Sequence, residues 1–304
     1  MPLRLRHRYW AALLLLGLGF SPAVRAEGVL ERVARSGQLQ LVGPADRPPL
    51  VSLDAKGQPH GFAVVVAERV VARLSRALGR PVRLRFEAVH DGAELDQRLS
   101  SGRAELACGL PFTWARDMVL DYSLPIAVSG LRLLAPAGRF SGDPAALAGR
   151  NIGVVNGSLA ESTLRGVQPA ARVVTFPGLP EALDALNSGR VEAVLGDSLL
   201  LKGLAAQRGL GGLVVTPEVP FERYGLVCAM PENASAFRNL VNHAIAELQQ
   251  DYLDGEPATV ALVDRWLGPG SAVNLSPSRI RSVFEALLLG TEALRPLPTR
   301  SATP

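Results

Sequence analysis

The feature that most constrains the fold of this chain is one short pattern that occurs twice. Residues 101–110 read SGRAELACGL and residues 188–197 read SGRVEAVLGD, and each copy follows a stretch with helical spacing. Gly102 and Gly189 supply the left-handed residue that commonly ends a helix. Strand and helix signals alternate in the same order before each copy, which is typical of mostly parallel sheets with helices on both faces. The repeat predicts an α/β protein with two lobes of one plan; coincidence between two ordinary αβ units is the alternative.

The N-terminus has the pattern of a secretory signal peptide. Three arginines precede an apolar stretch over residues 10–20, and Val24 and Ala26 stand at the small-residue positions of a cleavage site. We expect export to the periplasm with cleavage after Ala26. A membrane anchor is the alternative, but a span needs about 20 apolar residues. No Cys follows the apolar stretch, so the sequence does not support a lipid anchor.

Charge and motif content exclude several classes of function. The predicted leader holds four arginines and no acidic residue, which leaves 28 basic and 28 acidic residues in the rest of the chain. A neutral balance removes the electrostatic argument for a nucleic-acid partner. The chain has neither a phosphate-binding loop nor a nucleophile elbow. The three histidines beyond the leader are scattered, so we expect no metal and no cofactor.

Two strand ends and one helix start offer the side chains that a ligand site needs. Thr113, Trp114 and Arg116 follow the strand of the first copy, and Asp197 ends the second copy. A helix begins near Ser158, where free N–H groups attract anions. Ligands of open α/β sheets sit at the carboxyl ends of strands, so we expect these residues around a cleft between the lobes. The plainer alternatives are a surface ion pair for the Arg and a helix cap for the Asp.

Four motifs occur in order along the chain: DAKGxxxGF at 54–62, TxxR with a downstream DYSLP at 113–125, LAGRNIGVVNGS at 147–158, and SGRVEAVLGD at 188–197. Together they resemble the periplasmic solute-binding proteins of polar amino-acid uptake systems. The resemblance covers roughly residues 37–268 and implies the type 2 periplasmic binding fold. A weaker likeness, in the stretch CG…FTWxRD…DYSLP, is to orphan binding-like proteins associated with radical-SAM peptide-maturation clusters.

The resemblance implies a role for each candidate side chain. Arg116 matches the residue that takes the α-carboxylate of the ligand, and a guanidinium fits a carboxylate with two parallel hydrogen bonds. Asp197 matches the acid that accepts hydrogen bonds from the α-ammonium group. Thr113 and the amides near Ser158 and Leu159 would complete the carboxylate cradle. One zwitterion that contacts both lobes would favour a closed form.

Some positions depart from the pattern of the family. Arg47, followed by two prolines, stands where many members have an aromatic residue that stacks on the ligand, which makes Arg47 a further candidate contact. Trp114 would then be the replacement platform. Pro111 and Phe112 fall where the family often has small hydroxyl residues. These departures leave the identity of the ligand open.

The resemblance also bears on the cysteines. Cys108 and Cys228 are the two cysteines of the chain. In the type 2 fold the strands that carry them are neighbours in lobe 1, close enough for a bridge. The resemblance therefore implies a Cys108–Cys228 disulfide, and two buried thiols are the alternative.

The expected organisation is a leader, two lobes and a short C-terminal region. Lobe 1 comprises residues 27–134 and 225–270, lobe 2 comprises 135–224, and residues 271–304 hold a helix near 277–290 and a disordered tail. Another helix is expected over about residues 65–78.

The expected function is a monomeric periplasmic binding protein that delivers an amino acid or similar small zwitterion to a membrane ABC permease. Two alternatives stay open. One is a small-acid dehydratase-like enzyme of the same fold, in which Asp197, Glu161 or Asp46 would serve as acid or base. The other is a ligand-sensing or peptide-sensing binding protein that is not tied to transport.

Overall fold

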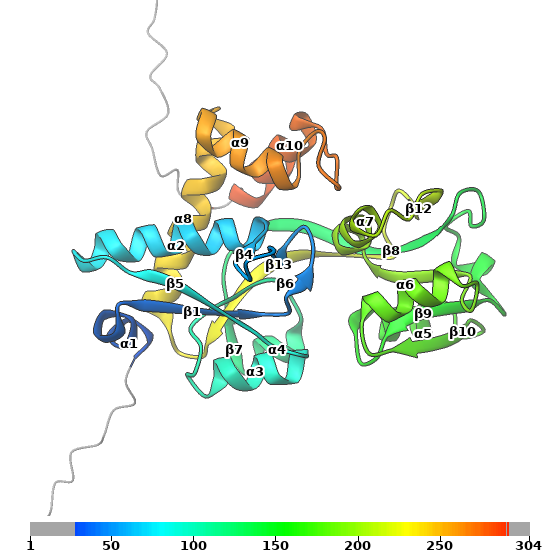
Figure 1. Ribbon diagram of the computed structural model, residues 1–304, viewed down its shortest axis with the longest axis horizontal. Coiled ribbons are helices and arrows are strands. Elements are labelled where there is room, and N and C mark those ends of the chain that lie inside the picture. The colour runs from blue at the N-terminus through cyan, green and yellow to red at the C-terminus, as the bar shows by residue number, and fades with distance from the viewer. Residues whose placement is uncertain (1–27, 290, 292–304) are drawn as a thin grey trace, which may run out of the picture.

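Two lobes joined by a pair of long strands form the computed structural model, which describes residues 28–289 and 291 (Figure 1). The expected signal peptide, its cleavage after Ala26 and the expected disordered tail lie outside the described residues. Within the described ranges, none of the helices has the length and hydropathy of a membrane span.

Lobe 1 is organised around a parallel strand pair, β1 with β5, and a bridge from Leu41 to Leu106 continues the parallel arrangement toward β6. Helices α2 and α3 provide the crossovers, as the alternating pattern predicts. The elements of lobe 1 are α1 (Val29–Ser36), β1 (Gln38–Gly43), β2 (Asp46–Arg47), β3 (Val51–Leu53), β4 (Pro59–His60), α2 (Phe62–Leu78), β5 (Arg83–Ala88), α3 (Gly92–Ser100), β6 (Ala107–Pro111), α4 (Trp114–Asp117) and β7 (Leu120–Tyr122).

Helix α2 begins earlier than the sequence pattern predicts, at Phe62 rather than near residue 65. Its first amides are satisfied by a separate segment: Phe62 N–H donates to the carbonyl of Pro49 at 2.9 Å, and Ala63 N–H donates to that of Leu50 at 3.0 Å. Free N-terminal amides are a cost that a helix must meet with some acceptor. These acceptors come from tertiary structure, so no local cap signalled the start.

Lobe 2 repeats the plan with three parallel strands in the order β10–β9–β11. Helices connect successive strands of this set along the chain: α5 lies between β9 and β10, and α6 lies between β10 and β11. Gly189, with φ of 75°, ends the helix before the second repeat copy, as Gly102, with φ of 69°, does in lobe 1. The elements of lobe 2 are η1 (Pro144–Leu147), β9 (Asn151–Val155), α5 (Leu159–Val167), β10 (Arg172–Phe176), α6 (Leu179–Asn187), β11 (Ala193–Asp197), α7 (Ser198–Gln207) and β12 (Leu213–Thr216).

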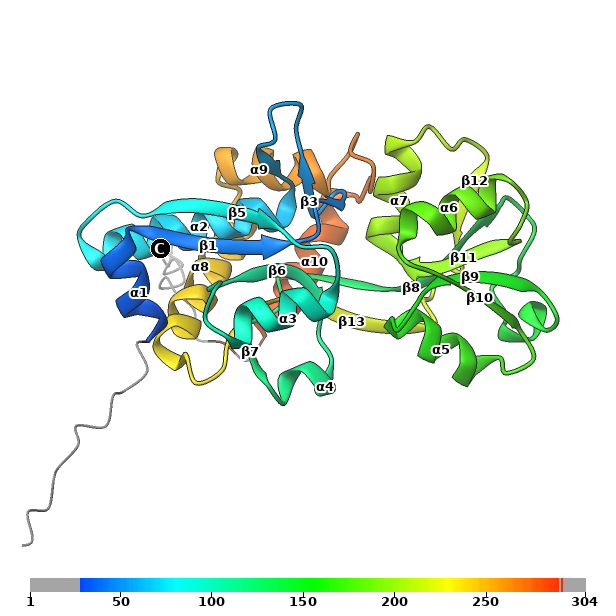
Figure 2. The ribbon, with the colours of Figure 1, turned by 60° about the horizontal axis from the view of Figure 1, so that its bottom comes forward.

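Two antiparallel strands join the lobes, β8 (Ala127–Pro136) and β13 (Glu222–Pro231). They pair with each other over residues 127–131 and 222–226 and then diverge. Strand β8 continues beside β11 and β12, whereas β13 continues beside β6 and β7 (Figure 2). The parallel arrangement is thus found inside each lobe, and the strands of the join are antiparallel because the chain crosses once in each direction.

Three C-terminal helices complete the molecule: α8 (Ser235–Leu253), α9 (Pro257–Trp266) and α10 (Pro277–Leu288). Helix α8 packs on α2, and α10 packs on α8 and on β8. The bounds of α10 agree with the helix predicted near residues 277–290. The segment between α9 and α10 also reaches lobe 2, where Lys202 Nζ donates to the carbonyl of Val273 at 3.2 Å.

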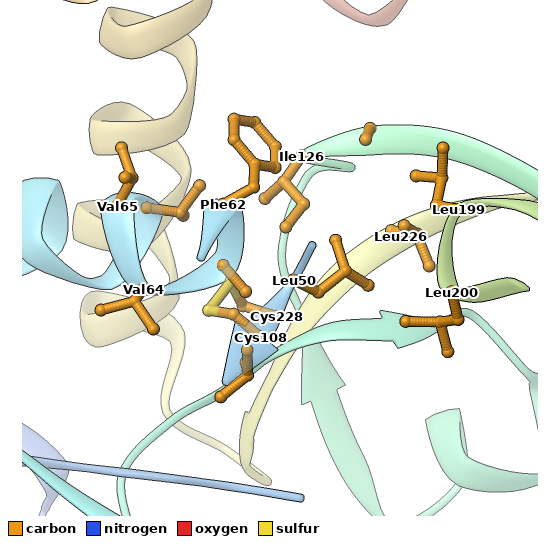
Figure 3. Packing of buried hydrophobic residues seen from close by; sticks show 14 of the residues in the cluster. Leu50, Phe62, Val64, Val65, Cys108, Ile126, Leu199, Leu200, Leu226 and Cys228 are labelled. Carbon is orange, nitrogen blue, oxygen red and sulfur yellow. A yellow bond between two sulfur atoms is a disulfide. The ribbon is translucent and has the colours of Figure 1, made fainter. Parts of the chain in front are cut away.

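Cys108 and Cys228 form a disulfide in the core of lobe 1. They are register partners on β6 and β13, with Cα atoms 3.9 Å apart. Figure 3 shows the bridge among the buried side chains beside α2. The bond links positions 120 residues apart in the sequence, so it ties the returning strand of the join to the first half of lobe 1.

Removal of this bridge should lower stability. A cross-link between distant residues reduces the entropy of the unfolded chain, and its loss costs about 2–5 kcal/mol in small exported domains. We expect the double variant Cys108→Ala/Cys228→Ala to show a free energy of unfolding in urea lower by that amount. A reducing agent should destabilise the natural chain and leave the variant unchanged. Equal urea midpoints for the two proteins would contradict this prediction.

Candidate functional site

A cavity of about 250 Å³ lies between the lobes and is lined by residues of both. Its lobe 2 wall consists of the segments that follow β9, β10 and β11, where the carboxyl ends of the parallel strands meet. This is the position at which open α/β sheets bind ligands. Sites for drug-sized molecules occupy roughly 300–1,000 Å³, so the cavity suits a small ligand.

Asp197 ends β11 and lines the cavity. Its Oδ1 accepts hydrogen bonds from the amides of Leu199 at 2.9 Å and Leu200 at 3.1 Å. Asp197 therefore caps α7, which is the alternative role that the sequence analysis gives for it. Its Oδ2 accepts a hydrogen bond from the Tyr224 hydroxyl at 2.8 Å. The residue is 8% exposed. The carboxylate therefore has a structural role and also faces the cavity.

Burial dominates the electrostatics of Asp197. It raises the pKa of the carboxyl group, and the hydrogen bonds from Tyr224, Leu200 and Leu199 offset only part of that effect. Burial and the neighbouring carboxylate also raise the pKa of Tyr224, which therefore stays protonated and donates. A desolvated carboxylate at the cavity wall gains from a cationic group that enters the cavity.

The start of α5 forms a second part of the lobe 2 wall. Ser158 caps this helix: its Oγ accepts from Glu161 N–H at 3.3 Å and donates to the carbonyl of Val155 at 2.6 Å. Leu159 and Ala160 follow at the cavity, and their backbone amides donate no hydrogen bond within the described part of the chain. Free amides at a helix N-terminus attract an anionic group.

Arg47 reaches the cavity from lobe 1, on the segment that follows β1. Burial lowers the pKa of its guanidinium group, while the carboxylates of Asp46 and Asp197 act in the opposite direction. Its side chain forms neither a hydrogen bond nor an ion pair with any described residue. The cavity thus has a cationic side chain on one wall and a buried carboxylate on the other.

Arg116, Thr113 and Trp114 do not line the cavity. Arg116 Nε donates to Asp96 Oδ1 at 2.8 Å, and this pairing holds the pKa of Arg116 above its usual value although burial alone would lower it. Thr113 caps the short helix α4 through Arg116 N–H. Trp114 is 77% exposed and contacts Phe112 edge to face.

The structure therefore brings four of the predicted site residues together, Arg47, Ser158, Leu159 and Asp197, and places three elsewhere. Tyr224 was not predicted. It lies on β13 at the join, and its sequence context indicated only a strand. Its contact with Asp197 depends on how β13 passes lobe 2, which no local pattern reveals.

Apolar contacts beside the cavity hold the lobes together. Leu50 of lobe 1 belongs to the same buried cluster as Leu199 and Leu200 at the start of α7. Figure 3 shows Leu50 between the disulfide and these leucines. Farther along α7, Gly203 lies directly against the backbone carbonyl of Pro48, where a Cβ would overlap it. The structure thus has the lobes in contact on one side of the cavity.

Residues 39–269 match the bacterial extracellular solute-binding proteins, family 3, and the chain belongs to this family. The L-cystine-binding protein TcyJ of Escherichia coli K12 is 28% identical over 245 residues, which cover 80% of this chain and 87% of that protein. The L-glutamate/L-aspartate-binding protein of Pseudomonas aeruginosa PAO1 is 25% identical over 274 residues, with 84% and 87% covered.

The solved structures show the same fold. The ancestral amino acid-binding protein AncCDT-1, a precursor of cyclohexadienyl dehydratase, has a TM-score of 0.67 at 22% identity, with 79% of this chain and all of that chain covered. The predicted α/β fold with two lobes and the predicted solute-binding family are both confirmed. The chain is a solute-binding protein, and most members of its family bind solutes without turning them over.

The contact between Gly203 and Pro48 predicts how the lobes can be held apart. A Gly203→Ala change adds a methyl group where the two backbones meet, and such overpacking costs about 1–3 kcal/mol. That cost falls on the form with the lobes in contact. We expect small-angle scattering to show a larger radius of gyration for Gly203→Ala than for the natural chain.

Gly166→Ala is the matched control, because Gly166 lies in helix α5 of the same lobe with open space where its Cβ would stand. Both changes favour the helix by about 0.5–1 kcal/mol, so helix propensity cannot explain a difference between them. Identical radii of gyration for the two variants would show that the contact does not hold the lobes.

Proposed function

We propose that this chain captures an amino acid or a similar small zwitterion in the cavity between its lobes. The observation that supports this most is the pairing of opposite charges there, with the buried carboxylate of Asp197 from lobe 2 and the guanidinium of Arg47 from lobe 1. A ligand that carries both charges satisfies both groups, whereas an ion of one sign leaves the other unpaired in a desolvated site.

The ammonium group of the ligand binds Asp197 in this proposal. Asp197 accepts hydrogen bonds from the Tyr224 hydroxyl, from Ser129 and from the amides that it caps, and the ammonium group of the ligand adds a charged donor to this set. Charge-assisted hydrogen bonds contribute about 1.5–3 kcal/mol each, so a few of them suffice for micromolar affinity near −8 kcal/mol. A ligand that contacts both walls also favours the form with the lobes in contact.

The cellular role proposed here is delivery to a membrane ABC permease by a monomeric protein outside the cytoplasm. The family comprises extracellular proteins, and the sequence offers a leader with cleavage after Ala26. Two of the relatives are named for the amino acids that they bind, cystine in one and glutamate or aspartate in the other. These names support an amino acid as the class of ligand.

The acids named for an enzymatic alternative are engaged in ways that suit a binding role. Glu161 accepts from Arg165 and from the amide of Gly157, and these bonds lower its pKa, so it stays ionised. Asp46 is an exposed residue of the cavity lining. Asp197 caps α7. We therefore propose binding without turnover.

A thermal-shift screen tests the proposal. The mature chain is unfolded and refolded to strip any carried molecule, then mixed with the protein amino acids, L-cystine, small carboxylates and small amines. A ligand at 100 times its dissociation constant adds about 2.7 kcal/mol to the free energy of unfolding. We expect at least one amino acid to raise Tm. Failure of every amino acid would overturn the zwitterion proposal.

An Asp197→Asn change should separate binding from stability. Asn is as good a helix cap as Asp, so α7 keeps its cap, while the charge that the ammonium group needs is removed. We expect the amino-acid response to be lost and Tm without ligand to stay equal or rise. Asp143→Asn is the control, since Asp143 caps η1 in the same lobe away from the cavity.

The same variant should change the pH dependence of stability. Because burial raises the folded-state pKa of Asp197 above its ordinary value of 3.8, the folded protein keeps a proton that the unfolded chain releases. The contribution of Asp197 to the free energy of unfolding is therefore greatest below that value and falls as pH rises through the raised pKa. Urea unfolding from pH 3.5 upward should show this decline in the natural chain and a weaker one in Asp197→Asn.

A further inference from the structure

The part of the chain that follows the family match contacts both lobes. The match ends at residue 269, whereas the structure describes the chain through residue 289. Residues 270–289, the C-terminal segment, comprise a loop and helix α10. The segment lies at the join, where α10 packs on α8 and β8 and the loop reaches α7 of lobe 2 (Figure 1). A segment in this position affects how the lobes move relative to each other.

The C-terminal segment is fixed firmly to lobe 1. Ile280 and Phe284 of α10 are buried, and the ring of Phe284 packs edge to face on Tyr252 of α8, with ring centroids 5.4 Å apart. Arg281 Nη2 donates to the carbonyl of Leu253 at 2.7 Å, at the end of α8 where carbonyls lack helical partners. Buried apolar contacts are the main favourable contribution to folding, so α10 moves with lobe 1.

The loop before α10 is held in one shape by its own hydrogen bonds. Leu275 N–H donates to the carbonyl of Leu267, just after α9, at 2.9 Å. Asn274 Oδ1 accepts from Gly270 N–H at 3.1 Å. Asn274 has φ of 53°, a left-handed conformation that Asn adopts more readily than most residues. These bonds fix the direction of the carbonyl of Val273, which lies in the same loop.

The loop meets lobe 2 at a polar contact. Lys202 Nζ of α7 donates to the carbonyl of Val273 at 3.2 Å, and its side chain forms no other hydrogen bond or ion pair within the described residues. Burial and, to a smaller extent, the charge of Arg132 lower the pKa of Lys202. A cavity of about 560 Å³ separates parts of the loop from α7 and β12. The loop therefore packs less densely on lobe 2 than α10 packs on lobe 1, and this contact is the one that breaks more easily.

The contact of Lys202 lies beside the place where the lobes touch. The next residue of α7 is Gly203, which lies directly against the carbonyl of Pro48 in lobe 1. Successive residues of a helix point about 100° apart, so α7 has Pro48 on one side and the loop with Val273 on another. Movement of α7 away from lobe 1 breaks both contacts.

We propose that the C-terminal segment is a latch that holds the lobes in contact before a ligand binds. It is carried by lobe 1 and engages lobe 2 through the hydrogen bond from Lys202 to Val273. A bond that forms only when the lobes are in contact shifts the equilibrium toward that form. For a ligand that binds between the lobes, which rests on the function proposed above, a larger share of this form raises the apparent affinity. The latch thus sets the affinity from outside the cavity, since neither Lys202 nor Val273 lines it.

Small-angle scattering without ligand tests the latch. Lys202→Met and Lys202→Ala remove the donor and suit a helix as well as Lys does, whereas Lys202→Arg keeps a charged donor. Lys56→Met is the matched control, because Lys56 is the other lysine of the chain and is exposed between β3 and β4 of lobe 1. The far-ultraviolet circular dichroism spectrum and Tm verify that each variant folds.

We expect a larger radius of gyration in Lys202→Met and Lys202→Ala than in the natural chain, and no change in Lys202→Arg or Lys56→Met. Loss of one hydrogen bond should change the ratio of contacted to separated lobes by about 2- to 12-fold. Calorimetry with the amino acid that gives the largest thermal shift should show an affinity weaker by up to the same factor in the two variants that lack the donor.

A radius of gyration in Lys202→Met and Lys202→Ala equal to that of the natural chain would overturn the proposal. An equal increase in Lys56→Met, which leaves the contact intact, would overturn it as well. Unchanged affinity in variants whose radius of gyration has grown would show that the latch does not set the affinity. If no amino acid binds, the proposed function is wrong, and the scattering without ligand still decides whether the segment holds the lobes.

Discussion

The antiparallel pairing of β8 with β13 is the interaction on which the rest of the structure depends. The two strands are bonded to each other only where they cross between the lobes, and each then enters the sheet of a different lobe. Gly130 allows the close approach at this crossing, since a Cβ there would overlap the carbonyl of Glu222. The crossing places the strand ends of lobe 2 opposite lobe 1 and so creates the cavity. It also carries Tyr224 to Asp197.

Asp197 has a structural role in the fold and also lies at the wall of the cavity. The carboxylate caps α7 and accepts from Tyr224, and these bonds fix its direction. Burial nevertheless raises its pKa, so the charged form is less stable there than in water. A protein selected for stability alone has no need of that charge, because Asn caps a helix equally well. A desolvated charge at a cavity wall lowers stability, and sites that bind a ligand often accept such a loss of stability.

The two arginines show why residue type and motif do not establish a ligand contact. Arg116 follows the strand of the first repeat copy, as the family pattern requires, yet it bonds Asp96, which lies 20 residues away on α3. Arg47 lies in a segment without a recognisable motif, yet it lines the cavity, where the carboxylates of Asp46 and Asp197 act on its charge. Arg116 pairs with an acid inside lobe 1, whereas the acids that act on Arg47, Asp46 and Asp197, line the cavity. The charge that a ligand meets is therefore set by which acids the fold places beside each base.

Sequence patterns alone predicted the alternation of strands and helices in each lobe, the two-lobed plan and the position of Asp197 at a strand end. These follow from hydrophobic periodicity, from Gly102 and Gly189 as helix stops, and from a repeat long enough to carry a whole strand. The tertiary structure alone decided the start of α2, which takes its cap from Pro49 and Leu50, and the contact of Tyr224 with Asp197. It also decided which arginine faces the cavity. Local patterns report the preferences of neighbouring residues, whereas caps, ion pairs and cavity walls here join segments that only the packing of the lobes and their joining strands brings together.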